Sequence, residues 1–281
     1  MKAYPVTILC KVMEVSRSGF YDYLCRLNNP KCDDPIESAL NNRIKIIFKE
    51  SRQSYGSRRV LKKLQSEGYQ LGRYRVRSLM KKLGLRPRRP RRYKVTTNSK
   101  HSFPVVSNLL DRKFDVNKPD KVWASDITYV WTSQGWVYLA VVMDLFSRQI
   151  VGWASDKHMQ SKLTIDALAM AYWRRKPCEG LLHHSDRGSQ YACSDYQMHL
   201  KKYEMTPSMS RKGDCWDNAP VERFFGSLKT ERLESYRFAT RKEAQIEILD
   251  YITYYNFDRL HSTLGYQSPM QYEKEQLQKV A

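Results

Sequence analysis

Three acidic residues stand where a hydrophobic core would not accept an unpaired charge. Asp126 lies inside a run of strand-forming residues, Asp186 ends another such run, and Glu222 falls in the first turns of a predicted helix. A buried carboxylate needs a cation nearby, because taking an unpaired charge out of water is costly. Hard carboxylate oxygens suit Mg²⁺ or Mn²⁺, so the three residues together predict a site for divalent metal ions.

The spacing of these residues adds to that prediction. There are 59 residues between Asp126 and Asp186, and 35 between Asp186 and Glu222. Lys229 follows seven positions after Glu222, about two helical turns away, so both side chains lie on one helix face. The Lys229 ammonium group can then meet a DNA phosphate beside the metal site. The alternative is three unrelated surface acids, but three local motifs would then have to coincide with one spacing.

Other residues near the trio have simpler interpretations. Asp144 follows a predicted strand and is expected to act as a turn or capping residue rather than as a fourth ligand. His183 and His184 would point to opposite faces of a strand, so that one packs and one approaches the site, and neither is expected to bind metal. Three tryptophans at strand positions are interpreted as core aromatics: Trp123, Trp136 and Trp153.

The elements that must position the trio begin after residue 119. Runs rich in β-branched and aromatic residues predict strands over 121–131, 136–146, 149–156, 181–186 and 206–210. Amphipathic runs predict helices over 161–176, 191–203, 219–233 and 241–258. Asp217 and Asn218 are expected to cap the helix that carries Glu222. A meander of three strands, followed by alternating helices and strands, predicts an α/β fold with helices packed on a mixed sheet.

The N-terminal part of the chain carries almost all of its excess positive charge. The whole sequence has 49 Lys and Arg against 29 Asp and Glu, a net charge of +20. Residues 1–118 contain 28 of the basic and 9 of the acidic residues, a net charge of +19. This asymmetry favours a polyanion-binding module joined to a second domain. Basic surfaces also serve solubility or ribosome association, so charge alone leaves nucleic-acid binding open.

Helical patterns fill this basic part. Two short helices are predicted within 5–27 and another over 43–50, and amphipathic helices begin at 57 and 72. One face of the last helix is cationic, and the proline-broken run 87–94 reads as an extended basic arm. The basic residues expected to contact DNA are Arg58, Arg59, Arg73, Arg75, Arg77, Lys81, Arg88, Arg89, Arg91 and Arg92.

The local sequences around the trio resemble a known family. WASDITYV, HHSDRGSQY and DNAPVERFFGSLKTE are similar to the Asp, Asp, 35-residue gap, Glu signature of retroviral-integrase-like (DDE) transposases. The resemblance is to the second-frame product of a bacterial insertion-sequence family that encodes its transposase in two overlapping frames, and it covers residues 1 to about 275. It implies a ribonuclease-H-like catalytic domain with a five-stranded mixed sheet. It also implies a characteristic C-terminal segment at 255–269.

The resemblance further implies a division of the chain and an activity. The expected parts are an N-terminal helical region 1–50, a helix-turn-helix DNA-binding domain with its arm 51–95, a linker 96–118, an integrase-like core 119–256 and a C-terminal segment 257–281. The implied reaction is metal-dependent cleavage at the 3′ ends of an insertion sequence and strand transfer into target DNA. Two metal ions, held by Asp126, Asp186 and Glu222, would stabilise the attacking and leaving oxygens.

The implied partners are the terminal inverted repeats, target DNA, further copies of the chain, and a first-frame product fused to or associated with it. Two departures are visible, because the chain has no His-His-Cys-Cys zinc domain and no leucine-zipper heptads. Two alternatives stay open: a catalytically silent DNA-binding regulator, and a ribonuclease-H-like nuclease or junction resolvase.

Composition sets the expected compartment. No run approaches the ~20 apolar residues that span a bilayer, and the N-terminal apolar run is interrupted by Lys11 and Glu14. The six cysteines show no C-x-x-C pair and no zinc-site spacing. Reduced thiols and a bacterial cytoplasmic, nucleoid-associated protein are therefore expected.

Overall fold

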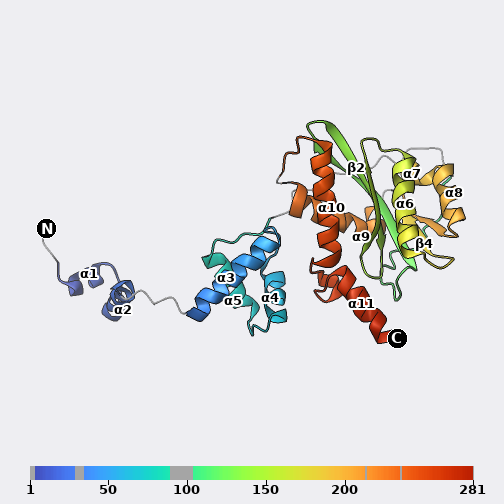
Figure 1. Cartoon of the computed structure of the whole chain (residues 1–281). Coiled ribbons are helices and arrows are strands. Elements are labelled where there is room, and N and C mark those ends of the chain that lie inside the picture. The colour runs from blue at the N-terminus through green and yellow to red at the C-terminus, as the bar shows by residue number, and fades with distance from the viewer. Residues whose placement is uncertain (1–3, 29–34, 89–103, 213, 235, 281) are drawn as a thin grey trace.

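A computed structural model describes residues 4–28, 35–88, 104–212, 214–234 and 236–280 (Figure 1). The N-terminal part is helical, as its sequence pattern predicts. Helices α1 (Val6–Val12) and α2 (Arg17–Asn28) contact each other. The Gly19 N–H donates to Ser16 Oγ at 3.1 Å, so the Ser16 side chain caps the start of α2.

Three further helices form a separate hydrophobic core. They are α3 (Pro35–Glu50), α4 (Ser57–Ser66) and α5 (Arg73–Lys82). The helix predicted over 43–50 is wrong at its N-terminal end, because α3 already begins at Pro35 and buries Leu40 against α4 and α5. The fully buried members of this core are Ile44, Val60, Leu64 and Val76.

A five-stranded sheet forms the larger part of the molecule. Its strands are β1 (Val122–Thr132), β2 (Gly135–Asp144), β3 (Ile150–Asp156), β4 (Leu182–Ser185) and β5 (Thr206–Met209). The spatial order is β3-β2-β1-β4-β5, with β1 to β3 antiparallel and β4 and β5 parallel to β1. The order confirms the predicted meander and the mixed five-stranded sheet of the ribonuclease-H-like fold.

Helices cover both faces of this sheet (Figure 1). The elements α6 (Ser161–Arg175), α7 (Ser189–Ala192) and α8 (Ser194–Lys202) pack with Trp123 and Val142 in one core. On the other face, α9 (Ala219–Leu228) and α10 (Arg241–Phe257) pack with Val141 and Met143. Alternate residues of β2 thus serve opposite cores, as the two-residue period of a strand requires.

Two segments are more ordered than the sequence predicts. The predicted linker 96–118 is described from 104 onward, and there it belongs to the sheet domain, because Leu110 is buried in the core and Ser208 Oγ accepts a hydrogen bond from the Leu109 N–H at 2.9 Å. The C-terminal tail contains a 3₁₀ turn, η3 (Ser262–Leu264), and a helix, α11 (Pro269–Val280). Within the described residues, none of the helices is long and apolar enough to cross a membrane.

Candidate active site

The pairing of β1 with β4 brings the first two acidic residues side by side. Ser125 and Ser185 are register partners in this parallel pair, so that Asp126, the next residue of β1, lies beside Asp186, the first residue after β4. Asp126 Oδ1 accepts a hydrogen bond from the Ile127 N–H at 2.7 Å, and Asp186 Oδ1 accepts one from the Gly188 N–H at 2.9 Å. Both carboxylates are half-buried.

The third acidic residue approaches from α9. Glu222 lies in the first turn of this helix, after Pro220, whose missing N–H costs nothing at that position. The opposite face of α9 is buried through Val221 and Phe224. Asn218, just before the helix, donates from Nδ2 to the Ser125 carbonyl at 3.0 Å, which ties the start of α9 to β1 beside Asp126.

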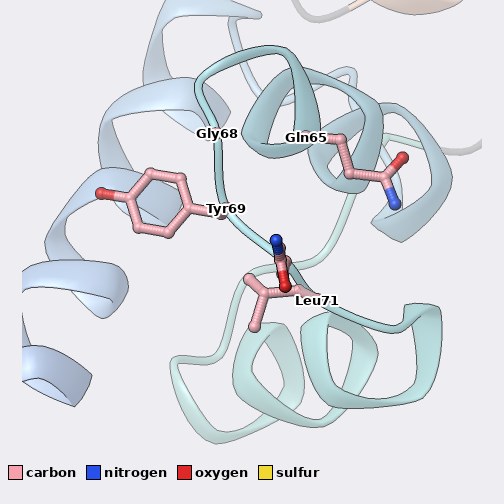
Figure 2. A pocket seen from close by; sticks show the side chains of 5 residues that line it. Gln65, Gly68, Tyr69 and Leu71 are labelled. Carbon is pink, nitrogen blue, oxygen red and sulfur yellow. The ribbon is translucent and has the colours of Figure 1, made fainter.

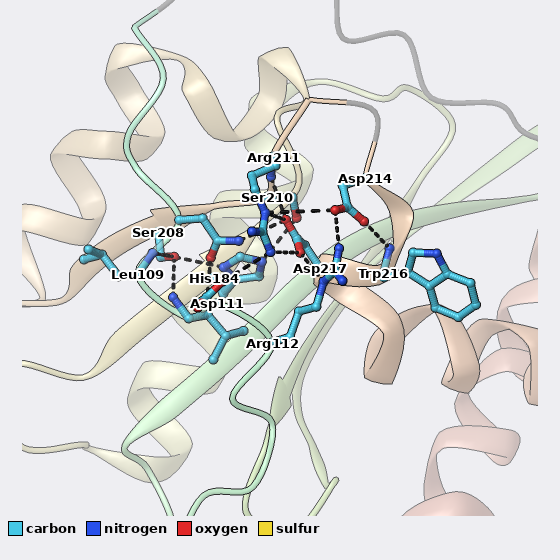
Figure 3. Close-up of polar contacts among 12 residues, drawn as sticks. Leu109, Asp111, Arg112, His184, Ser208, Ser210, Arg211, Asp214, Trp216 and Asp217 are labelled. Carbon is cyan, nitrogen blue, oxygen red and sulfur yellow. Dashed lines mark hydrogen bonds and ion pairs between the residues drawn. The ribbon is translucent and has the colours of Figure 1, made fainter.

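A cluster of arginines and acids holds the turn that precedes α9 (Figure 3). The Asp217 side chain is fully buried, and its carboxylate accepts hydrogen bonds from Arg112 at 2.8 Å and from Arg211 at 2.9 Å. Asn108 Nδ2 donates to the same carboxylate at 2.9 Å. The predicted capping role of Asp217 and Asn218 is therefore wrong, because neither side chain caps α9 and both bind more distant segments. Most of these partners lie far away in the chain, so the local sequence offers no signal for them.

The three carboxylates lie close enough to one another to affect each other's ionisation. Burial raises the pKa of Asp126 well above its usual value, and repulsion from Asp186 and Glu222 raises it further. Burial and Asp186 also raise the pKa of Glu222. Burial lowers the pKa of Lys229, while attraction to Asp126 opposes that shift. The Lys229 ammonium lies 5.3 Å from the centre of the Tyr129 ring.

This donor set fits divalent cations. Three hard oxygen donors that repel one another gain stability from a shared positive charge. Within the described parts of the chain, no three acidic, histidine or cysteine side chains are already arranged around a single metal position. The fold thus brings the carboxyl groups close enough to act on one another.

The remaining residues near the trio have structural roles. Asp144 is confirmed as a turn residue, since its Oδ1 accepts from the Phe146 N–H at 2.9 Å. His183 and His184 are both buried. His183 Nε2 lies 2.9 Å from Ser125 Oγ, and His184 bonds to serine hydroxyls of β5 and the residue after it. Burial lowers the pKa of His183 to about 3 and that of His184 to about 4, so both rings are neutral.

The basic residues predicted to contact DNA fall into three groups. Five are exposed on α4 and α5: Arg58, Arg73, Arg75, Arg77 and Lys81. Two bind the sheet domain instead, because Arg59 pairs with Glu231 at 3.4 Å and Arg88 donates to the Glu231 carbonyl at 3.1 Å. Arg89, Arg91 and Arg92 lie outside the described residues. A hollow of about 640 Å³ between α4 and α5, lined by Gln65, Tyr69 and Leu71, contains none of the three carboxylates (Figure 2).

The sheet order, with acidic residues on β1, after β4 and on α9, defines a polynucleotidyl transferase of the ribonuclease-H-like class. Three family models match the chain. A model described as an integrase core domain matches residues 116–215, a second integrase core domain model matches 222–277, and an HTH-like domain model matches 35–93.

Full-length relatives identify the family. The chain is 42% identical to the insertion element IS600 uncharacterized 31 kDa protein of Shigella sonnei, over 97% of this chain and 100% of that protein. It is 38% identical to transposase InsF for insertion sequence IS3A of Escherichia coli (strain K12), over 98% of this chain and 96% of that protein. The chain belongs to the IS3-type family of DDE transposases, and it is a DNA transposase.

A solved structure supports the fold alone. It is the simian T-cell lymphotropic virus intasome in complex with PP2A regulatory subunit B56 gamma. The match has a TM-score of 0.50 and 20% identity, and it covers 63% of this chain and 60% of that chain.

Proposed function

We propose that Asp126, Asp186 and Glu222 are the catalytic residues of this transposase and hold its metal ions. The observation that carries the proposal is their mutual electrostatic coupling, in which Asp186 raises the pKa values of both Asp126 and Glu222. Packing alone would not favour three carboxylates in one place, because each negative charge raises the free-energy cost of ionising the other two. The residues come from β1, from the position after β4 and from α9. A function for their joint negative charge explains why the fold keeps them.

The cofactor is Mg²⁺ or Mn²⁺, with two ions in the site. When bound, the ions supply positive charge to the attacking and leaving oxygens of an in-line displacement. The three carboxylates would hold these ions, and Asp126 and Asp186 are oriented by their backbone hydrogen bonds. Lys229, on the same helical segment as Glu222, contacts a phosphate oxygen of the DNA strand.

The reaction has two displacements. Water first attacks the phosphodiester at the end of the element, which leaves a 3′-hydroxyl on the element and a 5′-phosphate on the flanking strand. That hydroxyl then attacks a target phosphodiester, joins the target 5′-phosphate and releases a target 3′-hydroxyl. Neither step needs a covalent link to the protein, so no serine, tyrosine or cysteine nucleophile is invoked.

The DNA contacts are divided between the two domains. The exposed basic residues of α4 and α5 bind phosphates at the terminal inverted repeat: Arg58, Arg73, Arg75, Arg77 and Lys81. Target DNA meets the carboxylates.

The chain acts as a homo-oligomer, fused to or associated with a first-frame product, at the bacterial nucleoid. The support for this last proposal is the likeness to InsF, over nearly the whole length of both chains.

The test uses the full-length chain, a labelled oligonucleotide of the terminal repeat and a plasmid target in Mg²⁺. Asp126→Asn, Asp186→Asn and Glu222→Gln should each abolish cleavage and joining while the mobility shift of the repeat survives. Asp166→Asn, on the exposed face of α6, is the matched control and should keep both activities. Cleavage retained in any one of the three variants would refute its assignment. Cleavage without joining by the unmodified chain would favour a nuclease, and a shift without chemistry would favour a regulator.

A further inference from the structure

The hairpin of β1 and β2 ends in a group of aromatic rings, one half-buried and two exposed, which we call the hairpin aromatic cluster: Tyr129, Trp131 and Trp136. Trp131 and Trp136 are register partners, with ring centres 4.7 Å apart, and Trp136 lies 5.0 Å from the Tyr129 ring. Trp131 is 60% exposed and Trp136 is 41% exposed. The prediction that Trp136 is a core residue is therefore wrong.

Hydrogen bonds from three directions fix the backbone that carries the hairpin aromatic cluster. Thr132 Oγ1 donates to the Gly135 carbonyl at 2.6 Å, and the Ser133 N–H donates to the Phe238 carbonyl at 2.9 Å. Arg241, at the start of α10, donates from Nε to the Trp136 carbonyl at 3.1 Å. These hydrogen bonds fix the backbone of the hairpin that carries the rings, so little backbone conformational entropy is lost when the rings bind a ligand.

Tyr129 and Trp131 lie on the face of β1 opposite to Asp126, and Lys229 connects the cluster to the candidate active site. Tyr129 lies beneath the Lys229 ammonium, and Lys229 is attracted to Asp126. Along β1, Tyr129 is roughly 10 Å and Trp131 roughly 17 Å from Asp126, at about 3.3 Å per residue. A stacked strand advances about 3.4 Å per nucleotide, so these rings stand about three to five nucleotides from the reacting phosphate.

We propose that the hairpin aromatic cluster binds unpaired bases of the DNA strand close to the phosphate that is cleaved. Flat rings stack on the faces of bases that have left the duplex, and they do so with little regard to sequence. The cations Lys229 and Arg241 flank the rings, which suits a polyanion and not an apolar protein surface. This inference rests on the proposed position of the active site at Asp126.

The experiment measures binding by the full-length chain in EDTA, so that no cleavage occurs. Two probes are compared: a blunt duplex of the terminal repeat, and the same duplex with four unpaired thymines at the cleaved end. The unmodified chain should prefer the unpaired end, and the double variant Trp131→Ala, Trp136→Ala should lose about tenfold or more of that preference. Trp173→Ala, which removes a tryptophan that is 66% exposed on α6, should leave it unchanged.

A second readout locates the contact. A 2-aminopurine placed three to five nucleotides from the cleaved phosphate should be quenched by the unmodified chain and by Trp173→Ala, but not by the double variant. The proposal is overturned if the double variant keeps the preference for unpaired ends. It is also overturned if the substitutions reduce self-association in sedimentation instead, because the rings would then contact a second copy of the chain. Cleavage of the blunt duplex by the unmodified chain in Mg²⁺, measured separately, reports on the proposed catalytic residues and does not depend on either outcome.

Discussion

Neutralising the buried acid Glu231 should cost the protein a large part of its stability. Glu231 lies in the π-helical turn η2 (Lys229–Leu233), which directly continues α9. Its two carboxylate oxygens accept hydrogen bonds from Arg259 at 2.7 Å and 2.8 Å, and one of them also accepts from the Tyr251 hydroxyl at 2.9 Å. Arg59 of α4 pairs with the same carboxylate at 3.4 Å. One acid therefore joins the helical domain, α10 and the segment that follows α10.

The size of the expected stability loss follows from the burial of Glu231 and its partner Arg259. Glu231 is 8% exposed and Arg259 is 3% exposed. Burial alone would raise the pKa of Glu231, but the hydrogen bonds and charges of Arg259 and Arg59 lower it below its usual value. Glu231→Gln keeps the size of the side chain and leaves the Arg259 charge buried without its partner. Breaking a buried pair in this way costs about 3–5 kcal/mol.

Urea unfolding followed by tryptophan fluorescence measures this loss as a shift of the transition midpoint at constant slope. Asp166→Asn, which breaks the exposed pair with Lys162, is the control and should change stability by less than about 0.5 kcal/mol. A double variant Glu231→Leu, Arg259→Met removes both buried charges, so it should recover most of the loss. A loss below about 1 kcal/mol for Glu231→Gln would refute the reasoning, because it would mean that water already compensates Arg259.

Three further outcomes are expected. Gly152→Ala would place a Cβ atom 2.3 Å from the Ala167 carbonyl oxygen of α6. The substitution should therefore lower the free energy of unfolding by about 1–3 kcal/mol or more, measured as a lower urea midpoint. Burial raises the pKa of Asp144 to about 7, so the native state binds its proton more tightly than the unfolded chain does, and stability should fall as pH rises from about 4 to 7. In Asp144→Asn the fall in stability across the same pH range should be smaller by the Asp144 contribution, while the part that comes from the raised pKa values of Asp126 and Glu222 remains. Arg75→Ala should reduce the salt dependence of repeat binding by about one unit of slope, whereas Arg59→Ala should leave the slope unchanged and lower stability.

Much of the sheet could be predicted from sequence because each strand has its own local signal. The strands around Asp126 and before Asp186 are short, β-branched runs bounded by turn residues, and the helix around Glu222 has a regular apolar stripe. The trio itself was predicted from three local motifs and one spacing. Local signals of this kind survive folding, because the two-residue and 3.6-residue periods decide which face of an element is buried.

The contacts between distant segments could not be predicted in this way. Glu231 sits in the polar run KTERL and looks like an ordinary solvated acid, and its burial depends on Arg259 and on Arg59, which is 172 residues away. The prediction that Trp136 is buried was wrong for the opposite reason. Its type and strand position indicate a core residue, but Trp136 lies at the end of the hairpin, where it stays 41% exposed.

The same helical segment links DNA recognition to chemistry. From α9 into η2 the chain carries Glu222, Lys229 and Glu231 in succession, and Glu231 binds Arg59 of the helical domain. Moving that domain away from the sheet would leave the buried Glu231 with fewer compensating charges, which is unfavourable. Under the proposed assignment, DNA held by the exposed face of α5 would be presented to the carboxylates at a fixed distance. The register between the bound repeat and the cleaved phosphate then follows from the fold, and end recognition need not be repeated at the active site.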